Sequence, residues 1–161
     1  MANPRATAAA TILWLGCLAT PALADVTGFL GVNTTPANRP VVGGAFSVSL
    51  LVIGFEGEYS QTTTDQTSGS PSLQTGMGNV FVQNPIPVGG IQVYVTAGGG
   101  IYREELGIEK TTDVGTNFGG GAKIELVSHI KLRVDYRVFK LAGSAKYATP
   151  KRLYLGLTLG L

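Results

Sequence analysis

The sequence predicts an all-β fold: an eight-stranded antiparallel transmembrane up-and-down β-barrel, preceded by a cleaved signal peptide. Three observations support this prediction. Eight segments alternate in polarity with a period of two residues, which is typical of β-strands. After residue 24, no segment has a sustained helical period or the apolar length of a transmembrane helix. The connections between the segments also alternate between longer and shorter ones.

Residues 1–24 have the composition of a secretory signal peptide. Arg5 supplies the positive charge ahead of an apolar run over 6–18, and Ala-Leu-Ala at the end predicts cleavage after Ala24. The run is too short to cross a bilayer as a helix. The alternative is a lipoprotein signal cut before Cys17. It is disfavoured because tryptophan and leucine stand where such signals usually carry leucine and a small residue.

Residues 25–161 are expected to form one domain, the barrel itself. The single cysteine lies in the signal peptide, so the mature protein has no disulfide and no thiol chemistry. The single histidine, His129, cannot form a histidine cluster for a metal, and no cofactor is expected. The whole chain has a net charge of +2 and loses Arg5 with the signal peptide, so no nucleic-acid partner is expected.

The predicted strands cover most of the mature chain. Each is close to the ~9–11 tilted residues that cross a bilayer. They are expected at 26–33, 41–49, 51–60, 76–83, 91–102, 116–126, 131–140 and 151–161.

The alternation gives most of these strands two distinct faces. The first strand follows the cleavage site directly. The second and third alternate aliphatic or aromatic residues, such as Val42 and Phe55, with glycine, serine or glutamate, whereas the facing of the fourth is ambiguous. In the fifth, sixth and seventh, aliphatic residues share one face and polar or charged residues share the other. The eighth has leucine at every second position: Leu153, Leu155, Leu157, Leu159 and Leu161.

The connections indicate an orientation for the barrel. Longer connections follow odd-numbered strands, notably the polar stretch 61–75 and the charged stretch 103–115. Shorter ones mostly follow even-numbered strands. Bacterial outer-membrane barrels have short periplasmic turns and longer external loops, so both termini are expected in the periplasm.

Charged residues within the strands gather on single faces: Glu56, Glu58, Lys123, Glu125, Arg133, Asp135, Arg137 and Arg152. The default for alternating antiparallel strands is a soluble barrel with its charges in water. We favour the opposite arrangement, because the charged faces are also rich in glycine, threonine and tyrosine, which suit a narrow interior. The charges then form a structural network inside the barrel, and the five C-terminal leucines face lipid.

Two stretches, "QVYVTAGGGIYRE" and "NFGGGAKIELVSHIKLRVDYRVFKL", resemble the fifth to seventh strands of the OmpA-like and opacity-type outer-membrane β-barrel superfamily. With the signal peptide and the C-terminal strand, the resemblance covers the whole mature chain. It implies contact with outer-membrane lipid and with the assembly machinery of the periplasm and outer membrane. The chain departs from the family by ending in Leu161 where phenylalanine is common, and by its few candidate aromatic residues for a girdle.

Three motifs have an alternative catalytic or ligand-binding interpretation. Two glycine triplets resemble phosphate loops but lack the helix and the Lys-Ser/Thr that a P-loop needs. Ser128 and His129 are adjacent in the sequence, and adjacent residues on a strand or tight turn point apart. Glu56 and Glu58 have the composition of an acid–base pair, but arginines facing them favour a structural role. No catalytic residue is predicted.

The expected function is structural or interactive, including adhesion, through loops that a monomeric outer-membrane barrel displays to an unknown extracellular partner. No enzymatic activity is expected. The first alternative is a small porin-like channel for ions or small solutes. The second is a soluble periplasmic carrier of lipocalin type.

Overall fold

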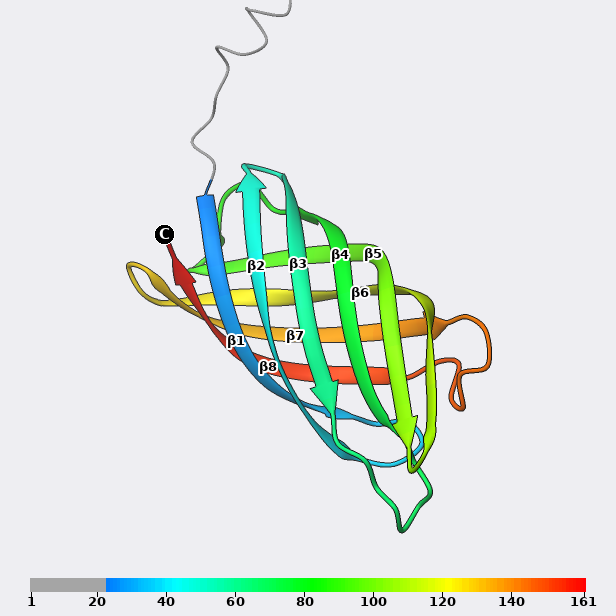
Figure 1. The fold of residues 1–161 in the computed structure, drawn as a ribbon. Helices are drawn as coiled ribbons and strands as arrows, with labels where there is room; N and C mark the ends of the chain where they lie inside the picture. Colours follow the sequence, from blue (N-terminus) through cyan, green and yellow to red (C-terminus); the bar gives the residue numbers. More distant parts are fainter. Residues whose placement is uncertain (1–22) are drawn as a thin grey trace, which may run out of the picture.

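The computed structural model describes residues 23–161, which form a closed barrel of eight antiparallel strands, as predicted (Figure 1). Most of the predicted signal peptide therefore lies outside the described residues, and its last two residues, Leu23 and Ala24, begin the first strand. In residues 23–161 no helix is long and apolar enough to cross a membrane. The strands are β1 (Leu23–Asn33), β2 (Arg39–Leu50), β3 (Ile53–Thr62), β4 (Ser72–Gln83), β5 (Ile91–Leu106), β6 (Glu109–Val127), β7 (Ile130–Leu141) and β8 (Lys151–Gly160).

Each strand pairs with its neighbours in the sequence, and β8 closes the barrel by pairing with β1, from Asp25↔Gly160 to Asn33↔Arg152. The barrel therefore has two distinct ends (Figure 1). The end that we call the turn end carries the start of β1, the C-terminus and the connections 51–52, 84–90 and 128–129. The opposite end, the loop end, carries the connections 34–38, 63–71, 107–108 and 142–150.

The outer surface of the barrel is a continuous apolar face. The leucines of β8 alternate outward, and Leu153, Leu155, Leu157 and Leu159 are 50%, 56%, 55% and 51% exposed. Exposed aliphatic and aromatic side chains continue this face over the other strands, because every second residue of a strand points the same way. An apolar face of this extent would drive association in water, so it is suited to lipid.

The interior explains why the facing of β4 is ambiguous in the sequence. Leu73, Met77 and Phe81 are buried inside the barrel, 3%, 3% and 4% exposed, although they are apolar. They share the inner face with polar residues of the same strand. On β4 both faces therefore carry apolar side chains, and polarity alone could not separate them.

The stretch 103–115 is not the loop that the sequence predicts. β5 and β6 continue through it as a hairpin and are 16 and 19 residues long. Gly107, with a φ of 62°, fits the tight turn at its tip, and the β-branched residues around Thr111 suit an extended strand. Because a tilted strand crosses a bilayer in ~9–11 residues, the hairpin projects beyond the apolar belt at the loop end.

Candidate functional site: the polar network inside the barrel

The centre of the lumen is occupied by a carboxylate that two arginines hold from the opposite wall. Glu56 of β3 accepts hydrogen bonds from Nη1 of Arg133 at 2.5 Å and from Nη2 of Arg137 at 2.7 Å. Both arginines are on β7, which is not a sheet neighbour of β3. The three side chains are at most 5% exposed. These ion pairs therefore cross the barrel instead of linking adjacent strands.

Asp135 and Tyr94 complete this centre. Nη2 of Arg133 lies 2.6 Å from Oδ2 of Asp135, and the Tyr94 hydroxyl donates to the same oxygen at 2.7 Å. Nε of Arg133 in turn donates to the Tyr94 hydroxyl at 2.7 Å. A Cβ at Gly121 would lie 2.7 Å from that hydroxyl. The glycine triplet of β6 therefore leaves room for the large side chains of the network.

Glu58 extends the network towards the loop end. Its Oε2 lies 3.0 Å from Nη1 of Arg137, within ion-pair distance but outside hydrogen-bonding geometry. Its Oε1 accepts a hydrogen bond from the Tyr154 hydroxyl at 3.3 Å. Two amides join the network as well, because Asn117 donates to Asn79 at 2.7 Å and Asn79 donates to Glu56 at 3.3 Å. Every strand from β3 to β8 therefore contributes at least one side chain to the network.

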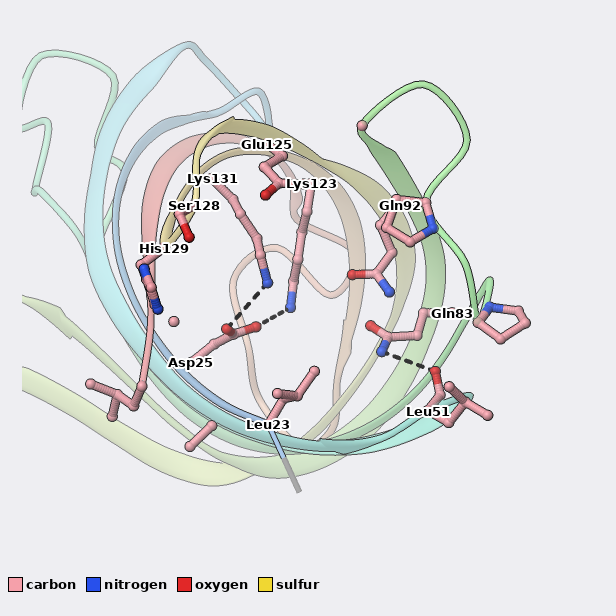
Figure 2. Close-up of a pocket in the computed structure, with 16 residues that line it drawn as sticks. Leu23, Asp25, Leu51, Gln83, Gln92, Lys123, Glu125, Ser128, His129 and Lys131 are labelled. Atoms are coloured by element: carbon pink, nitrogen blue, oxygen red, sulfur yellow. Dashed lines mark hydrogen bonds and ion pairs between the residues drawn. The ribbon is translucent and has the colours of Figure 1, made fainter. Parts of the chain in front are cut away.

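The turn end of the lumen holds a separate ion-pair cluster (Figure 2). Oδ2 of Asp25 on β1 lies 2.7 Å from Nζ of Lys123, and Oδ1 lies 3.5 Å from Nζ of Lys131. These side chains line a pocket of about 380 Å³ that opens at this end. Ser128 and His129 lie at its rim in Figure 2, and both are exposed. They are in the tight connection between β6 and β7, away from the central network.

Glu125 was predicted to belong to the interior network, and this prediction is wrong. The residue is exposed at the rim of the turn-end pocket, whereas Lys123, two residues earlier on the same face, is 4% exposed. The pairing of β6 with β7 is irregular between Glu125 and Val127, where the barrel ends. Glu125 is on the predicted face of β6, but it lies so near the end of the strand that its carboxylate stays outside the network.

The other seven predicted charges lie inside the barrel and are at most 5% exposed: Glu56, Glu58, Lys123, Arg133, Asp135, Arg137 and Arg152. They do not form one cluster. Lys123 belongs to the turn-end cluster with Asp25, and Arg152 donates to Ser60 at 2.7 Å and to Thr75 at 2.9 Å near the loop end. The polar side chains inside the barrel therefore form three layers: the turn-end cluster, the central network and the group around Arg152 near the loop end.

Several members of these layers were not predicted from the sequence: Asp25, Asn79, Tyr94, Asn117, Lys131 and Tyr154. Lys131 could have been found, because it continues the charged face of β7 at the same period. Asp25 lies inside β1, which begins three residues before the strand predicted at 26–33. The amides and tyrosines carry no charge, so only the barrel register brings them to the carboxylates.

The arrangement is suited to holding the barrel closed. The carboxylates and guanidinium groups of the centre pair with one another, and arginines hold both Glu56 and Glu58. Among residues 23–161 no group of three or more His, Cys, Asp or Glu side chains could hold a metal ion. Removing one partner of such a buried pair typically costs about 3–5 kcal/mol of stability.

Comparison with known proteins agrees with this architecture. A family model described as the outer membrane protein β-barrel domain matches residues 6–160. The N-terminal β-barrel domain of Pseudomonas aeruginosa OprF superimposes with a TM-score of 0.64 at 14% identity, over 86% of this chain and 97% of that one. Neisserial surface protein A gives 0.61 at 12% identity, over 87% and 94%.

A third similar structure is Ail, the attachment invasion locus protein of Yersinia pestis, in complex with the heparin analogue sucrose octasulfate. It gives a TM-score of 0.56 at 11% identity and covers 88% of this chain and 98% of that one. At these identities the likeness establishes the fold alone. A comparison with curated protein sequences found no match.

Proposed function

The chain belongs to the outer membrane protein β-barrel family, and from this premise we propose that it is a plugged barrel that anchors surface-exposed loops for contact with an extracellular partner. The observation that carries the proposal is the pair of arginines that reach Glu56 across the lumen. A barrel braced in this way is a rigid support. Neither transport nor catalysis is part of the proposed role.

The filled interior supports a closed lumen. An eight-stranded barrel is just wide enough for its own side chains. Here the central side chains are long and are paired from wall to wall, and Arg137 is 0% exposed. A solute would have to separate these ion pairs in order to pass.

The loop end is the surface that we propose to face outwards. In this class of protein the periplasmic turns are short and the extracellular loops are longer. The loop end carries the connections 63–71 and 142–150 and the projecting β5–β6 hairpin. At the hairpin tip, Ile108 is 99% exposed. A bulky apolar residue at the tip of a hairpin that projects beyond the apolar belt is suited to contact with another molecule.

Two observations bear on the alternatives. The pocket of about 380 Å³ at the turn end could serve as the entrance of a channel. The central network, however, crosses the lumen beyond this pocket. The soluble carrier receives no support, because the outer face is apolar and the family resides in the outer membrane.

Conductance in planar lipid bilayers tests the plugged barrel. The refolded wild-type protein should give no stable conductance steps at neutral pH. A reproducible unit conductance in the wild type would overturn the proposal and favour a channel. The matched variant is Glu56→Ala together with Arg133→Ala, which removes one crossing pair; conductance that appears only in this variant would assign the block to the network.

A further inference from the structure

A group of polar side chains at the loop end takes no part in the central network. Asn33, Arg39, Thr62 and Arg152 are 0%, 4%, 0% and 0% exposed. They belong to β1, β2, β3 and β8, each at or beside the end of its strand. The register places Asn33 directly opposite Arg39 on one side and Arg152 on the other. The group therefore lines one section of the inner wall just beneath the loops.

Hydrogen-bond donors in this group are left without partners among residues 23–161. They are Nε and Nη2 of Arg152, Nε of Arg39 and Nδ2 of Asn33; the Thr62 hydroxyl is also unpaired. Buried polar groups normally have a partner, because leaving a donor unsatisfied costs about 1–3 kcal/mol. Several unpaired donors within one group indicate that something other than this protein satisfies them.

The geometry of Arg152 indicates what kind of ligand this is. Its Nη1 is engaged with Ser60 at 2.7 Å and Thr75 at 2.9 Å, and its guanidinium carbon lies 4.6 Å from the centre of the Phe139 ring. The free atoms, Nε and Nη2, form one edge of the guanidinium and point two N–H groups in parallel. Such an edge matches two oxygens of a carboxylate, phosphate or sulfate.

The charge of the group points in the same direction. The ion pairs formed within residues 23–161 do not include the guanidinium of Arg39 or of Arg152. The nearest carboxylates to Arg39 are those of Asp65 and Glu104; neither lies within ion-pair distance, although the attraction of Asp65 for Arg39 exceeds the repulsion between Arg39 and Arg152. Glu104 already accepts a hydrogen bond from the backbone N–H of Lys146 at 2.9 Å. A buried charge without a close counter-ion is costly.

We propose that this group is a binding site for a small inorganic oxyanion of the phosphate or sulfate type. The Nε/Nη2 edge of Arg152 holds two of its oxygens, and Nε of Arg39, Nδ2 of Asn33 and the Thr62 hydroxyl donate to the remainder. The near-complete burial of all four side chains limits the ligand to a small ion. Nη1 of Arg39 is bonded to the carbonyls of Thr63 and Pro71, so the anion would also tie the loop 63–71 to the barrel.

Anion-dependent stability tests the site. The full mature protein, folded in detergent, is titrated with sodium phosphate and sodium sulfate against sodium chloride at constant ionic strength, and unfolding is followed by the gel shift between folded and unfolded forms. A ligand that binds only the folded state raises the unfolding midpoint in a saturable way. We expect this rise with phosphate or sulfate in the wild type.

Two variants assign the effect. Arg152→Lys keeps the positive charge but lacks the two-pronged edge, and should weaken the apparent affinity about tenfold or more, as expected for losing a charge-assisted hydrogen bond. Lys151→Gln, an exposed neighbour, should leave the affinity unchanged. Isothermal titration with phosphate provides the second measurement, and Asn33→Ala replaces Arg152→Lys if the latter does not fold. The proposal is overturned if neither oxyanion has a saturable effect beyond chloride, or if Arg152→Lys binds as the wild type does.

Discussion

Nη2 of Arg137 lies 2.7 Å from Oε1 of Glu56, and the two side chains meet across the barrel lumen. They come from β7 and β3, which share no backbone hydrogen bonds. Their side chains are 0% and 3% exposed. The barrel is therefore braced through its interior as well as around its wall, and this bracing gives rise to specific expectations for stability.

Arg133→Leu should destabilise the folded barrel by about 3–5 kcal/mol, because it leaves Glu56 and Asp135 without one of their partners. Water in the lumen would reduce this cost. Unfolding in urea, followed by the gel shift, measures the change. Arg103→Leu is the matched control, because Arg103 is 46% exposed in its pair with Glu105 and should change stability by about 1 kcal/mol or less. Equal effects of the two substitutions would argue against a buried network.

Leu157→Arg should cost about 2–4 kcal/mol if the outer face of β8 meets the bilayer midplane. Leu157 is 55% exposed on this face and lies in the middle of the strand. Leu161→Arg places the same charge at the end of the chain, where the cost should fall to about 0–1 kcal/mol near the interface. The comparison is made by unfolding in lipid vesicles. A cost that does not depend on depth would not fit a barrel in lipid.

The loop 63–71 should be reachable from outside intact cells. Ser68 is exposed in this loop, and Ser68→Cys should react with a membrane-impermeant thiol reagent before lysis. Val88, 78% exposed in the connection 84–90 at the opposite end, supplies the control. Val88→Cys should react only after lysis. The reverse pattern would mean that the barrel has the opposite orientation.

Asp65 in this loop should titrate below the usual range of aspartate. Its pKa is lowered chiefly by the hydroxyl of Ser68, which donates to Oδ2 at 2.7 Å, and then by the backbone N–H groups of Ser68 and Thr67. A carboxyl pKa that is lower in the folded protein stabilises the folded loop at pH values above the unfolded pKa of about 3.9. This stabilisation is lost as the pH falls through the folded-state pKa. Ser68→Ala should move the carboxyl pKa upwards in an NMR titration. An unchanged pKa would mean that the Ser68 hydroxyl does not stabilise the Asp65 carboxylate.

The number of strands and the polarity of most faces could be predicted because apolar and polar residues alternate with a period of two in the sequence, as in β7 and β8. The exceptions have physical causes. Met77 and Phe81 are apolar yet face inwards, because even a polar lumen must be filled. The β5–β6 hairpin was mistaken for a loop because its charged residues are those of a strand that has left the membrane.

The partners of the network were harder to predict than its members. Period and charge place Glu56 and Arg133 on inner faces, but only the closed register determines that they meet across the lumen. Neutral members such as Tyr94 and Asn117 have no signal of their own in the sequence. The unpaired edge of Arg152 is likewise a property of three-dimensional packing.

A double-mutant cycle between Glu56 and Arg133 tests the braced and plugged barrel most directly. Glu56→Gln, Arg133→Gln and the double variant are unfolded in urea beside the wild type, and the four free energies of unfolding are compared. Because the two groups are in contact at 2.5 Å and nearly fully buried, we expect the two substitutions to be non-additive, with a coupling energy of about 0.5–3 kcal/mol. Additivity within about 0.3–0.5 kcal/mol, as found for distant sites, would contradict it.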